Sequence, residues 1–267
     1  MRSSPNYVVD VYNKYIKYKN DKNREKRYEG NEHWYHASGA GSCSRKLYFE
    51  SVEQIKPTNP MNEDTLRLLR LGTIVHDDLE KALELHNNSI YNTLVYNTRD
   101  NNSIEKEINN KEKVKFHTEQ EITIEELNVR GFYDAVMEEG EGEEKRIYLN
   151  DLKTSGSWAW KMKFGKTKQF NPSIHYELQL GTYGYAIQEQ FGRLDGMFLL
   201  YYNKDTSKMK SVEIPLTYVS RAYLFWKNIK DEHKQGLPQF RDGVSPVQKW
   251  QCNYCQFLDL CKPPHKE

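Results

Sequence analysis

Two acidic residues and a lysine stand near the ends of neighbouring predicted strands. Asp134 lies in the first of these strands, and Asp151 and Lys153 lie in the next. Residues i and i+2 of a strand point to the same face, so Asp151 and Lys153 share a face and a hairpin brings Asp134 beside them. Burying such charges is costly unless something compensates them. The pattern fits an ordinary surface ion pair, and it also fits a divalent cation site.

A divalent cation would give this group of residues a defined chemistry. Carboxylate oxygens are hard ligands that suit Mg²⁺ or Mn²⁺, and these ions keep several waters and also bind phosphate groups. The metal ion lowers the pKa of a bound water and neutralises charge on a scissile phosphate. Lys153 would orient that water or stabilise developing negative charge. A metal site here would therefore suit phosphodiester hydrolysis, with an ordinary surface ion pair as the alternative.

Two helical features add to the same group. His76 lies on a long helix predicted before the strands, and Gln179 and Tyr183 share one face of a helix predicted after them, because they are four residues apart. Each feature taken alone is more typical of a structural role. Gly181 and Gly184 lower the helix propensity of the second helix, so we expect another backbone to pack closely against it.

Hydrophobic periodicity defines the elements that must position these residues. We expect helices over residues 1–28, 44–52, 63–86, 173–190 and 218–234. We expect strands over residues 114–124, 127–137, 146–153, 194–203 and 209–216. This order of elements predicts an α/β fold of the mixed α+β kind.

The ordered set is His76, Gly131-x-x-Asp134, Asp151-x-Lys153 and Gln179-x-x-x-Tyr183. It resembles the four successive motifs of the RecB-type exonucleases in the PD-(D/E)XK superfamily. The resemblance implies a restriction-endonuclease-like core, with a central mixed sheet flanked by helices. It implies that His76, Asp134 and Asp151 bind the catalytic metal and that Lys153 assists the attacking water. Gln179 and Tyr183 would shape the site and contact DNA. Tyr133 replaces the proline of the family motif, and the second acid is Asp instead of Glu.

The four cysteines of the chain are divided between its two ends. Cys252 and Cys255 form a C-x-x-C motif, Cys261 follows, and Cys43 lies near the front. We expect a reducing cytosolic environment, in which four thiols indicate a metal site more than disulfides. Four thiolates suit an iron–sulfur cluster or structural Zn²⁺. The spacing alone favours zinc, as the commoner metal of four-cysteine sites.

The sequences around the cysteines resemble the two cluster-binding segments of iron–sulfur RecB-type nucleases, a group that includes CRISPR-associated exonucleases. The resemblance implies a structural [4Fe-4S] cluster held by Cys43, Cys252, Cys255 and Cys261, with Zn²⁺ as the alternative. It extends over about residues 37–262. We therefore expect a nuclease domain over residues 37–267 and a basic helical extension over residues 1–36. A phage-encoded relative is as consistent with these features as a CRISPR protein.

The segment after Lys153 is a candidate DNA-binding clamp. Residues 152–176 contain no Asp or Glu, and they interleave lysines with aromatic residues. Lysines would track phosphates while aromatic rings stack on unpaired bases. The candidates are Trp158, Trp160, Lys161, Lys163, Lys166 and Lys168. The alternative is a surface loop whose aromatic residues cover the core.

Composition limits the classes of protein that remain. The chain has 267 residues, a net charge of +1 and a mean hydropathy of −0.90. Its 13% aromatic content argues against disorder, and its balanced charge argues against a uniformly basic nucleic-acid binder. We see no apolar signal or membrane segment, and so expect a cytoplasmic protein, in the host cytoplasm if it is phage-encoded.

The sequence thus predicts a Mg²⁺- or Mn²⁺-dependent exonuclease that acts on single-stranded DNA or DNA ends. No Walker A motif is present, so strand separation would require a separate helicase. CRISPR adaptation proteins are further expected partners, and the family resemblance is compatible with a homo-oligomer. The alternative function is a catalytically weak DNA-binding adaptor in CRISPR spacer acquisition or recombination.

Overall fold

The computed structural model describes residues 7–27, 33–87, 114–165, 174–242 and 250–261. The chain divides into two compact units, which we describe separately. The cysteine unit contains residues 1–35, 42–74 and 229–267, and the sheet unit contains residues 36–41 and 75–228. The prediction of a separate extension at residues 1–36 stays a prediction. The predicted DNA-binding residues Lys166 and Lys168 lie outside the described residues.

The helices in chain order are α1 (Tyr7–Arg27), α2 (Ser44–Leu47), α3 (Glu63–Asn87), α6 (Ser157–Phe164), α7 (Ile174–Phe191), α8 (Thr217–His233) and α9 (Trp250–Asn253). A π-helical turn over Tyr48–Val52 continues α2, and short 3₁₀ turns lie at Ala37–Gly39, Glu125–Leu127 and Gly142–Glu144. The strands are β1 (Tyr35–His36), β2 (Val114–Ile124), β3 (Val129–Glu139), β4 (Arg146–Ser155), β5 (Gly196–Asn203) and β6 (Met209–Ile214).

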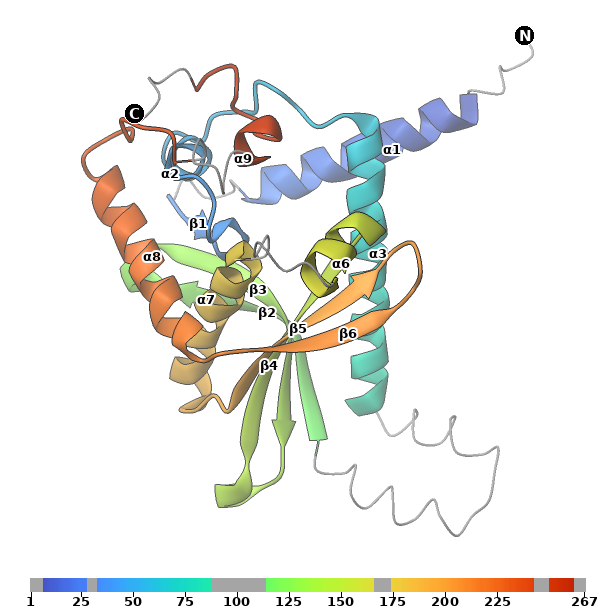
Figure 1. Cartoon of the computed structure of the whole chain (residues 1–267), viewed down its shortest axis with the longest axis vertical. Helices are drawn as coiled ribbons and strands as arrows, with labels where there is room; N and C mark the ends of the chain where they lie inside the picture. Colours follow the sequence, from blue (N-terminus) through green and yellow to red (C-terminus); the bar gives the residue numbers. More distant parts are fainter. Residues whose placement is uncertain (1–6, 28–32, 88–113, 166–173, 243–249, 262–267) are drawn as a thin grey trace. The chain divides into compact units, whose positions relative to one another are not determined.

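The predicted α/β class is confirmed, since the strands form one mixed sheet flanked by helices. The six-stranded sheet has the order β1-β3-β4-β5-β6, with β2 also paired to β3 (Figure 1). β2, β3 and β4 form an antiparallel meander joined by tight turns, and β6 is antiparallel to β5. β4 and β5 are parallel, which requires a crossover connection. That connection carries α6 and α7.

Helix α6 was not predicted from the sequence, since the composition of residues 152–176 indicated a loop or clamp. Its N-terminus is fixed by Asp205, whose carboxylate accepts the Ser157 backbone N–H at 2.6 Å. Trp160 and Phe164 stack on each other with ring centroids 4.7 Å apart, and Phe164 packs edge-on against Tyr201 of β5 at 5.2 Å. The aromatic residues therefore anchor a helix to the sheet.

Gly181 of α7 confirms the expectation of close backbone packing, whereas Gly184 packs against side chains. A Cβ atom added at Gly181 would lie 2.2 Å from the carbonyl oxygen of Tyr218 on α8. One added at Gly184 would lie 2.7 Å from the sulfur of Met197 on β5. Within the sheet unit, α7 thus lies against β5 on one side and against α8 on another (Figure 1).

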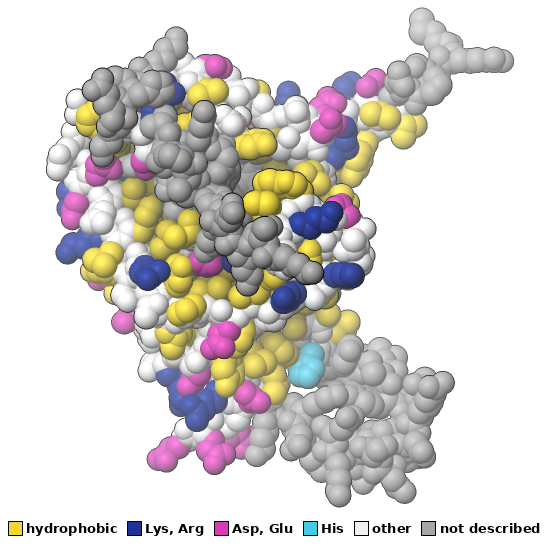
Figure 2. Space-filling view, in the orientation of Figure 1, with side chains coloured by type: hydrophobic (Ala, Val, Ile, Leu, Met, Phe, Trp, Pro, Cys, Tyr) yellow, Lys and Arg dark blue, Asp and Glu magenta, His cyan; other side chains and the backbone are white. Residues whose placement is uncertain are grey.

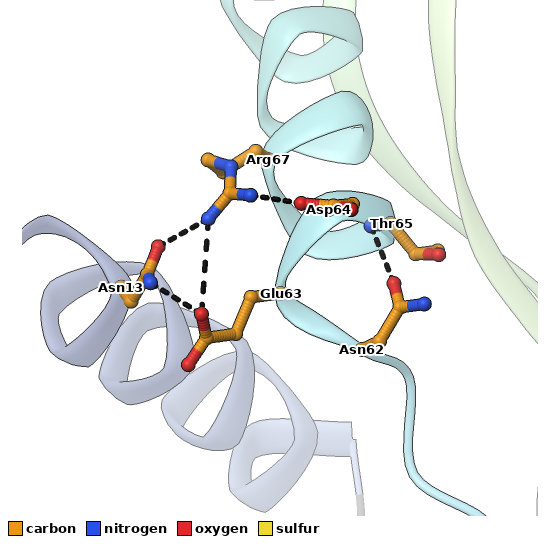
Figure 3. Close-up of polar contacts among 6 residues, drawn as sticks. All are labelled: Asn13, Asn62, Glu63, Asp64, Thr65 and Arg67. Atoms are coloured by element: carbon orange, nitrogen blue, oxygen red, sulfur yellow. Dashed lines mark hydrogen bonds and ion pairs between the residues drawn. The ribbon is translucent and has the colours of Figure 1, made fainter. Parts of the chain in front are cut away.

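The cysteine unit joins the first helix to the start of α3. The side chain of Arg67 contacts both Asn13 of α1 and Asp64, and the amide nitrogen of Asn13 donates to Glu63 (Figure 3). Asn62 caps α3 by accepting the backbone N–H of Thr65 at 2.8 Å. These polar contacts fix α1 against the N-terminal turn of α3. None of the helices in the described ranges combines the length and the apolarity that a membrane span needs.

Candidate active site

The two predicted acidic residues lie where strands β3 and β4 separate. Regular pairing between these strands ends with Ala135 opposite Asn150. The next residue on each strand is an aspartate, Asp134 on β3 and Asp151 on β4. The Asp134 carboxylate accepts the backbone N–H of Leu152 at 2.6 Å, so a side chain takes the place of a strand-to-strand hydrogen bond. Separation of the strands thus creates the space in which both carboxylates sit.

His76 of α3 lies beside the first of these carboxylates. Its Nδ1 atom is 3.4 Å from Oδ2 of Asp134. Burial alone would lower the pKa of His76, but the hydrogen bond and negative charge of Asp134 raise it above its usual value. Burial likewise opposes ionisation of Asp134, yet its contacts with His76 and Lys153 lower its pKa. The pair therefore favours an ionised Asp134.

Asp151 and Lys153 form a buried ion pair on β4. Their side chains are 1% and 12% exposed, and the Lys153 nitrogen is 2.6 Å from Oδ2 of Asp151. Burial raises the pKa of Asp151 to about 6, although the lysine charge opposes this effect. Burial would lower the pKa of Lys153, but the charges of Asp151 and Asp134 raise it. Lys153 is thus held protonated between two carboxylates.

Helix α7 supplies the next group of residues. Gln179 donates its amide N–H to the hydroxyl of Tyr183 at 3.1 Å, and both side chains are buried. Burial and then the charge of Asp151 raise the pKa of Tyr183, which places this phenol near the β4 ion pair. The Lys153 ammonium also lies 5.2 Å from the ring centroid of Tyr176. Tyr176 was not predicted as a site residue, although its position three residues before Gln179 puts it on the same face of the helix.

Glu119 of β2 is a second site residue that was not predicted from the sequence. The β2–β3 pairing is regular on both sides of Glu119 and Asp134, but these two opposed residues are not themselves paired. Glu119 has a φ of +46°, in the left-handed region. Burial and the nearby charge of Asp134 raise its pKa to about 7. No sequence motif marks Glu119, because only strand pairing brings it opposite Asp134.

A pocket of about 130 Å³ opens beside the carboxylates. Asp134 and Asp151 contribute to its lining, as does Asn150. Its remaining walls are largely apolar and include Leu79 and Leu83, which follow His76 on α3. The charged group is therefore not sealed in the core but borders a cavity that faces α3.

The donor types at this site fit a hard divalent cation. Oδ2 of Asp151 is buried and makes no hydrogen bond to any residue that the structure describes, so its compensation comes from the charge of Lys153. Within the described ranges, no three His, Cys, Asp or Glu side chains converge on a point that would hold an ion. Mg²⁺ often takes only one or two carboxylates and keeps its waters. Asp134 and Asp151 satisfy that smaller requirement.

The predicted DNA-binding residues of α6 do not all face outwards. The side chain of Trp158 is 74% exposed, and Lys161 is also exposed one turn further along. Trp160 is part of the stack on β5, while the Lys163 nitrogen lies 3.2 Å from the buried carboxylate of Glu177. Lysine and arginine side chains gather over the region of α6 and β6 (Figure 2). The exposed candidates are therefore Trp158 and Lys161.

In the cysteine unit, all four cysteines line one pocket. The backbone N–H of Cys43 donates to Gln251 at 3.1 Å, which joins the front segment to the C-terminal segment. The backbone N–H of Phe257 donates to the sulfur of Cys255 at 3.4 Å. Burial raises the pKa of Cys43 to about 12. The fold thus assembles the one-plus-three arrangement of cysteines that the sequence suggested.

The model of a protein family described as the PD-(D/E)XK nuclease superfamily matches residues 36–262. The chain belongs to this superfamily. Nucleases of the superfamily typically use divalent metal ions. The matched region includes the carboxylate site and all four cysteines, and it agrees with the range of about 37–262 expected from the motifs.

Several solved structures are similar to this nuclease. The crystal structure of SSO0001 has 17% identity and a TM-score of 0.49, and covers 96% of this chain and 98% of that chain. A candidate exonuclease from Eubacterium rectale has 14% identity and a TM-score of 0.47, with 90% and 95% coverage. An alkaline exonuclease from Laribacter hongkongensis has 13% identity and a TM-score of 0.35, with 80% and 94% coverage. No curated protein matches the chain at a significant level.

Proposed function

We propose that this protein is a metal-dependent exonuclease that hydrolyses single-stranded DNA or DNA ends. The proposal rests on one cluster of side chains at the point where β3 and β4 separate. There Asp134, Asp151 and Lys153 lie together beside His76. Membership in a nuclease superfamily supports phosphodiester hydrolysis as the reaction. Mg²⁺ or Mn²⁺ bound there would supply an activated water and charge neutralisation.

Each residue at the site has a distinct proposed role. Asp134 and Asp151 hold the metal ion through carboxylate oxygens, and His76 is a further ligand or orients Asp134. Lys153, kept protonated by its neighbours, stabilises negative charge on the phosphate and positions the water. Gln179 and Tyr183 fix the α7 side of the site through their hydrogen bond. These assignments rest on contacts among buried ionisable groups with shifted pKa values, which are typical of functional sites.

A cleavage assay with controlled metal content tests this function. We expect the protein to degrade single-stranded DNA in Mg²⁺ or Mn²⁺ and to lose that activity in excess chelator, because the carboxylates alone cannot activate water. DNA labelled at the 5′ end or the 3′ end, followed over time, separates exonuclease from endonuclease products. Tight DNA binding without cleavage in either metal would instead favour the adaptor alternative.

We propose that the outer face of α6 contacts the DNA strand. The support is the combination of an exposed tryptophan with an exposed lysine on a helix that directly follows the strand of Lys153. Trp158→Ala should weaken single-stranded DNA binding by about 1–3 kcal/mol, the usual contribution of one base stacked on an aromatic ring. Fluorescence anisotropy in Ca²⁺ would measure it without cleavage. Leu224→Ala, an exposed apolar truncation on α8, should leave affinity unchanged.

We further propose that Cys43, Cys252, Cys255 and Cys261 hold a [4Fe-4S] cluster, with Zn²⁺ as the alternative. The shared pocket and the backbone N–H directed at the Cys255 sulfur support a metal–thiolate centre. Four thiolates suit either group, and the resemblance of the cysteine segments to those of iron–sulfur nucleases favours the cluster.

Metal analysis of protein purified without oxygen tests the cluster. We expect about four iron and four sulfide ions per chain and a brown protein with broad visible absorption. Cys252→Ala should abolish both, because it removes one of the four ligands. A colourless protein with one zinc ion per chain would refute the cluster and leave the zinc alternative in place.

A further inference from the structure

The cysteine pocket contains two cations that were not predicted from the sequence as part of this site. Lys46 and Arg241 line it together with the four cysteines. Lys46 lies on α2, three residues after Cys43 and within the segment that resembles a cluster-binding motif. Arg241 lies near the end of the segment after α8 and belongs to no motif, so only the fold brings it to the pocket.

Arg241 has an unused donor at this pocket. Its Nε atom is buried and has no hydrogen-bond partner among the residues that the structure describes. A buried donor without an acceptor gives up its hydrogen bond to water without replacing it, so its retention calls for an explanation. Thiolate and sulfide sulfur atoms accept hydrogen bonds, and such bonds tune iron–sulfur centres. A metal–thiolate group in this pocket would provide the missing acceptor.

The charges near each cysteine agree with this assignment. Burial raises the pKa of Cys252, and the positive charge of Arg241 opposes that rise. Burial also raises the pKa of Cys255, opposed by the N–H of Phe257 and by Lys46. Asp242 acts in the opposite sense on Cys43 and Cys252, and its carboxylate also accepts the backbone N–H of Ser44 at 3.0 Å.

The negative charge of the proposed centre favours cations beside it. Four thiolates around a core of charge +2 carry a net charge of about −2, for a [4Fe-4S] cluster and for Zn²⁺ alike. Phe49, Phe257 and Leu258 give the pocket apolar walls. Charge in such surroundings is costly unless opposite charge lies nearby. Lys46 and Arg241 supply two positive charges at the pocket, and the negative charge of Asp242 offsets one of them.

We propose that Arg241 and Lys46 compensate the charge of the metal–thiolate centre, and that the Nε–H of Arg241 donates to a sulfur atom of that centre when it is bound. This inference rests on the proposed centre and adds two positioning residues to it. A nearby cation favours the more negative, reduced state of a cluster and therefore raises its reduction potential. Arg241 is the better residue to test, because Lys46 also lies 3.7 Å from Glu50.

The test compares the intact protein with three single variants. Arg241→Gln removes the charge, Arg241→Lys keeps the charge but lacks Nε, and Lys234→Gln removes an exposed lysine of the same unit that pairs with Asp231. Metal content, the rate of metal loss to a chelator and the reduction potential are measured for each. A redox titration followed by visible absorption gives the potential.

We expect Arg241→Gln to have a more negative potential than wild type and to lose metal several-fold faster. Arg241→Lys should fall between these two proteins, and Lys234→Gln should match wild type. Equal potentials and equal rates for wild type and Arg241→Gln would overturn this inference and leave the centre itself intact. If the wild-type protein binds zinc, which has no redox chemistry, the rate of metal loss alone tests this inference. A wild-type protein without bound metal would refute the centre and the inference together.

Discussion

Replacing Lys153 with alanine should lower metal-dependent DNA cleavage by at least about 100-fold, the usual effect of removing one group that stabilises transition-state charge. The lysine nitrogen lies 2.6 Å from the Asp151 carboxylate, and no other lysine or arginine is paired with that carboxylate in the described part of the chain. The end-labelled single-strand assay measures the loss. Lys145→Ala is the matched control, since Lys145 pairs with Glu138 at the far end of the β3–β4 hairpin. Equal cleavage by wild type and Lys153→Ala would refute the assigned role.

The same variant should also be less stable, in a way that depends on pH. Removing one partner of a buried pair costs about 3–5 kcal/mol, because Asp151 is left without its cation. Burial already raises the pKa of Asp151 to about 6, and loss of Lys153 raises it further. A raised carboxyl pKa means that the folded state holds the proton to higher pH than the unfolded state does, so stability falls as pH rises through this window.

Chemical denaturation at pH 5 and pH 8 separates the two effects of Lys153→Ala. We expect a smaller loss of unfolding free energy at pH 5, where folded Asp151 is protonated and neutral, than at pH 8. The cleavage assay should then be run well below the unfolding temperature of both proteins. A stability loss that is equal at the two pH values would contradict the assigned charge state of Asp151.

Gly181→Ala should destabilise the fold strongly. Its new Cβ would lie 2.2 Å from the Tyr218 carbonyl oxygen, 2.6 Å from its carbon and 3.1 Å from Cβ of Ala222. These are mostly backbone atoms of α8, so relief requires the whole helix to move. We expect a loss of about 3 kcal/mol or more, at the upper end for overpacked sites. Urea denaturation measures the change.

Two other glycines make this prediction specific. Gly184→Ala meets the thioether of Met197 at 2.7 Å, and a flexible side chain can move, so its cost should be smaller than that of Gly181→Ala. Gly156→Ala is the control, because the nearest atom to its Cβ would be 3.7 Å away and its φ is −79°. A cost at Gly181 no greater than that at Gly156 would show that α7 and α8 do not pack through this glycine.

The elements of the sheet were predictable because their signals are local. Alternation of apolar and polar residues defined β2 through β6 to within a few residues, and the long periodic segments defined α3, α7 and α8. Helix α6 was missed because its aromatic and lysine residues have no clear helical period. Its stability comes instead from Asp205 and from the stack of Trp160 and Phe164 on Tyr201, which are tertiary contacts.

The sequence by itself determined the order and spacing of the candidate site residues, because motif spacing is a property of the chain. Only the tertiary structure decided how those residues are charged. Asp134 and Asp151 lie close together because β3 and β4 stop pairing after Ala135 and Asn150. Burial raises the pKa of Asp151, whereas the contacts of Asp134 with His76 and Lys153 outweigh burial and lower its pKa. Glu119 and Arg241 gained their positions in the same way. Strand pairing brings Glu119 opposite Asp134, and folding brings Arg241 to the four cysteines. Such long-range contacts leave no periodic signal in the sequence.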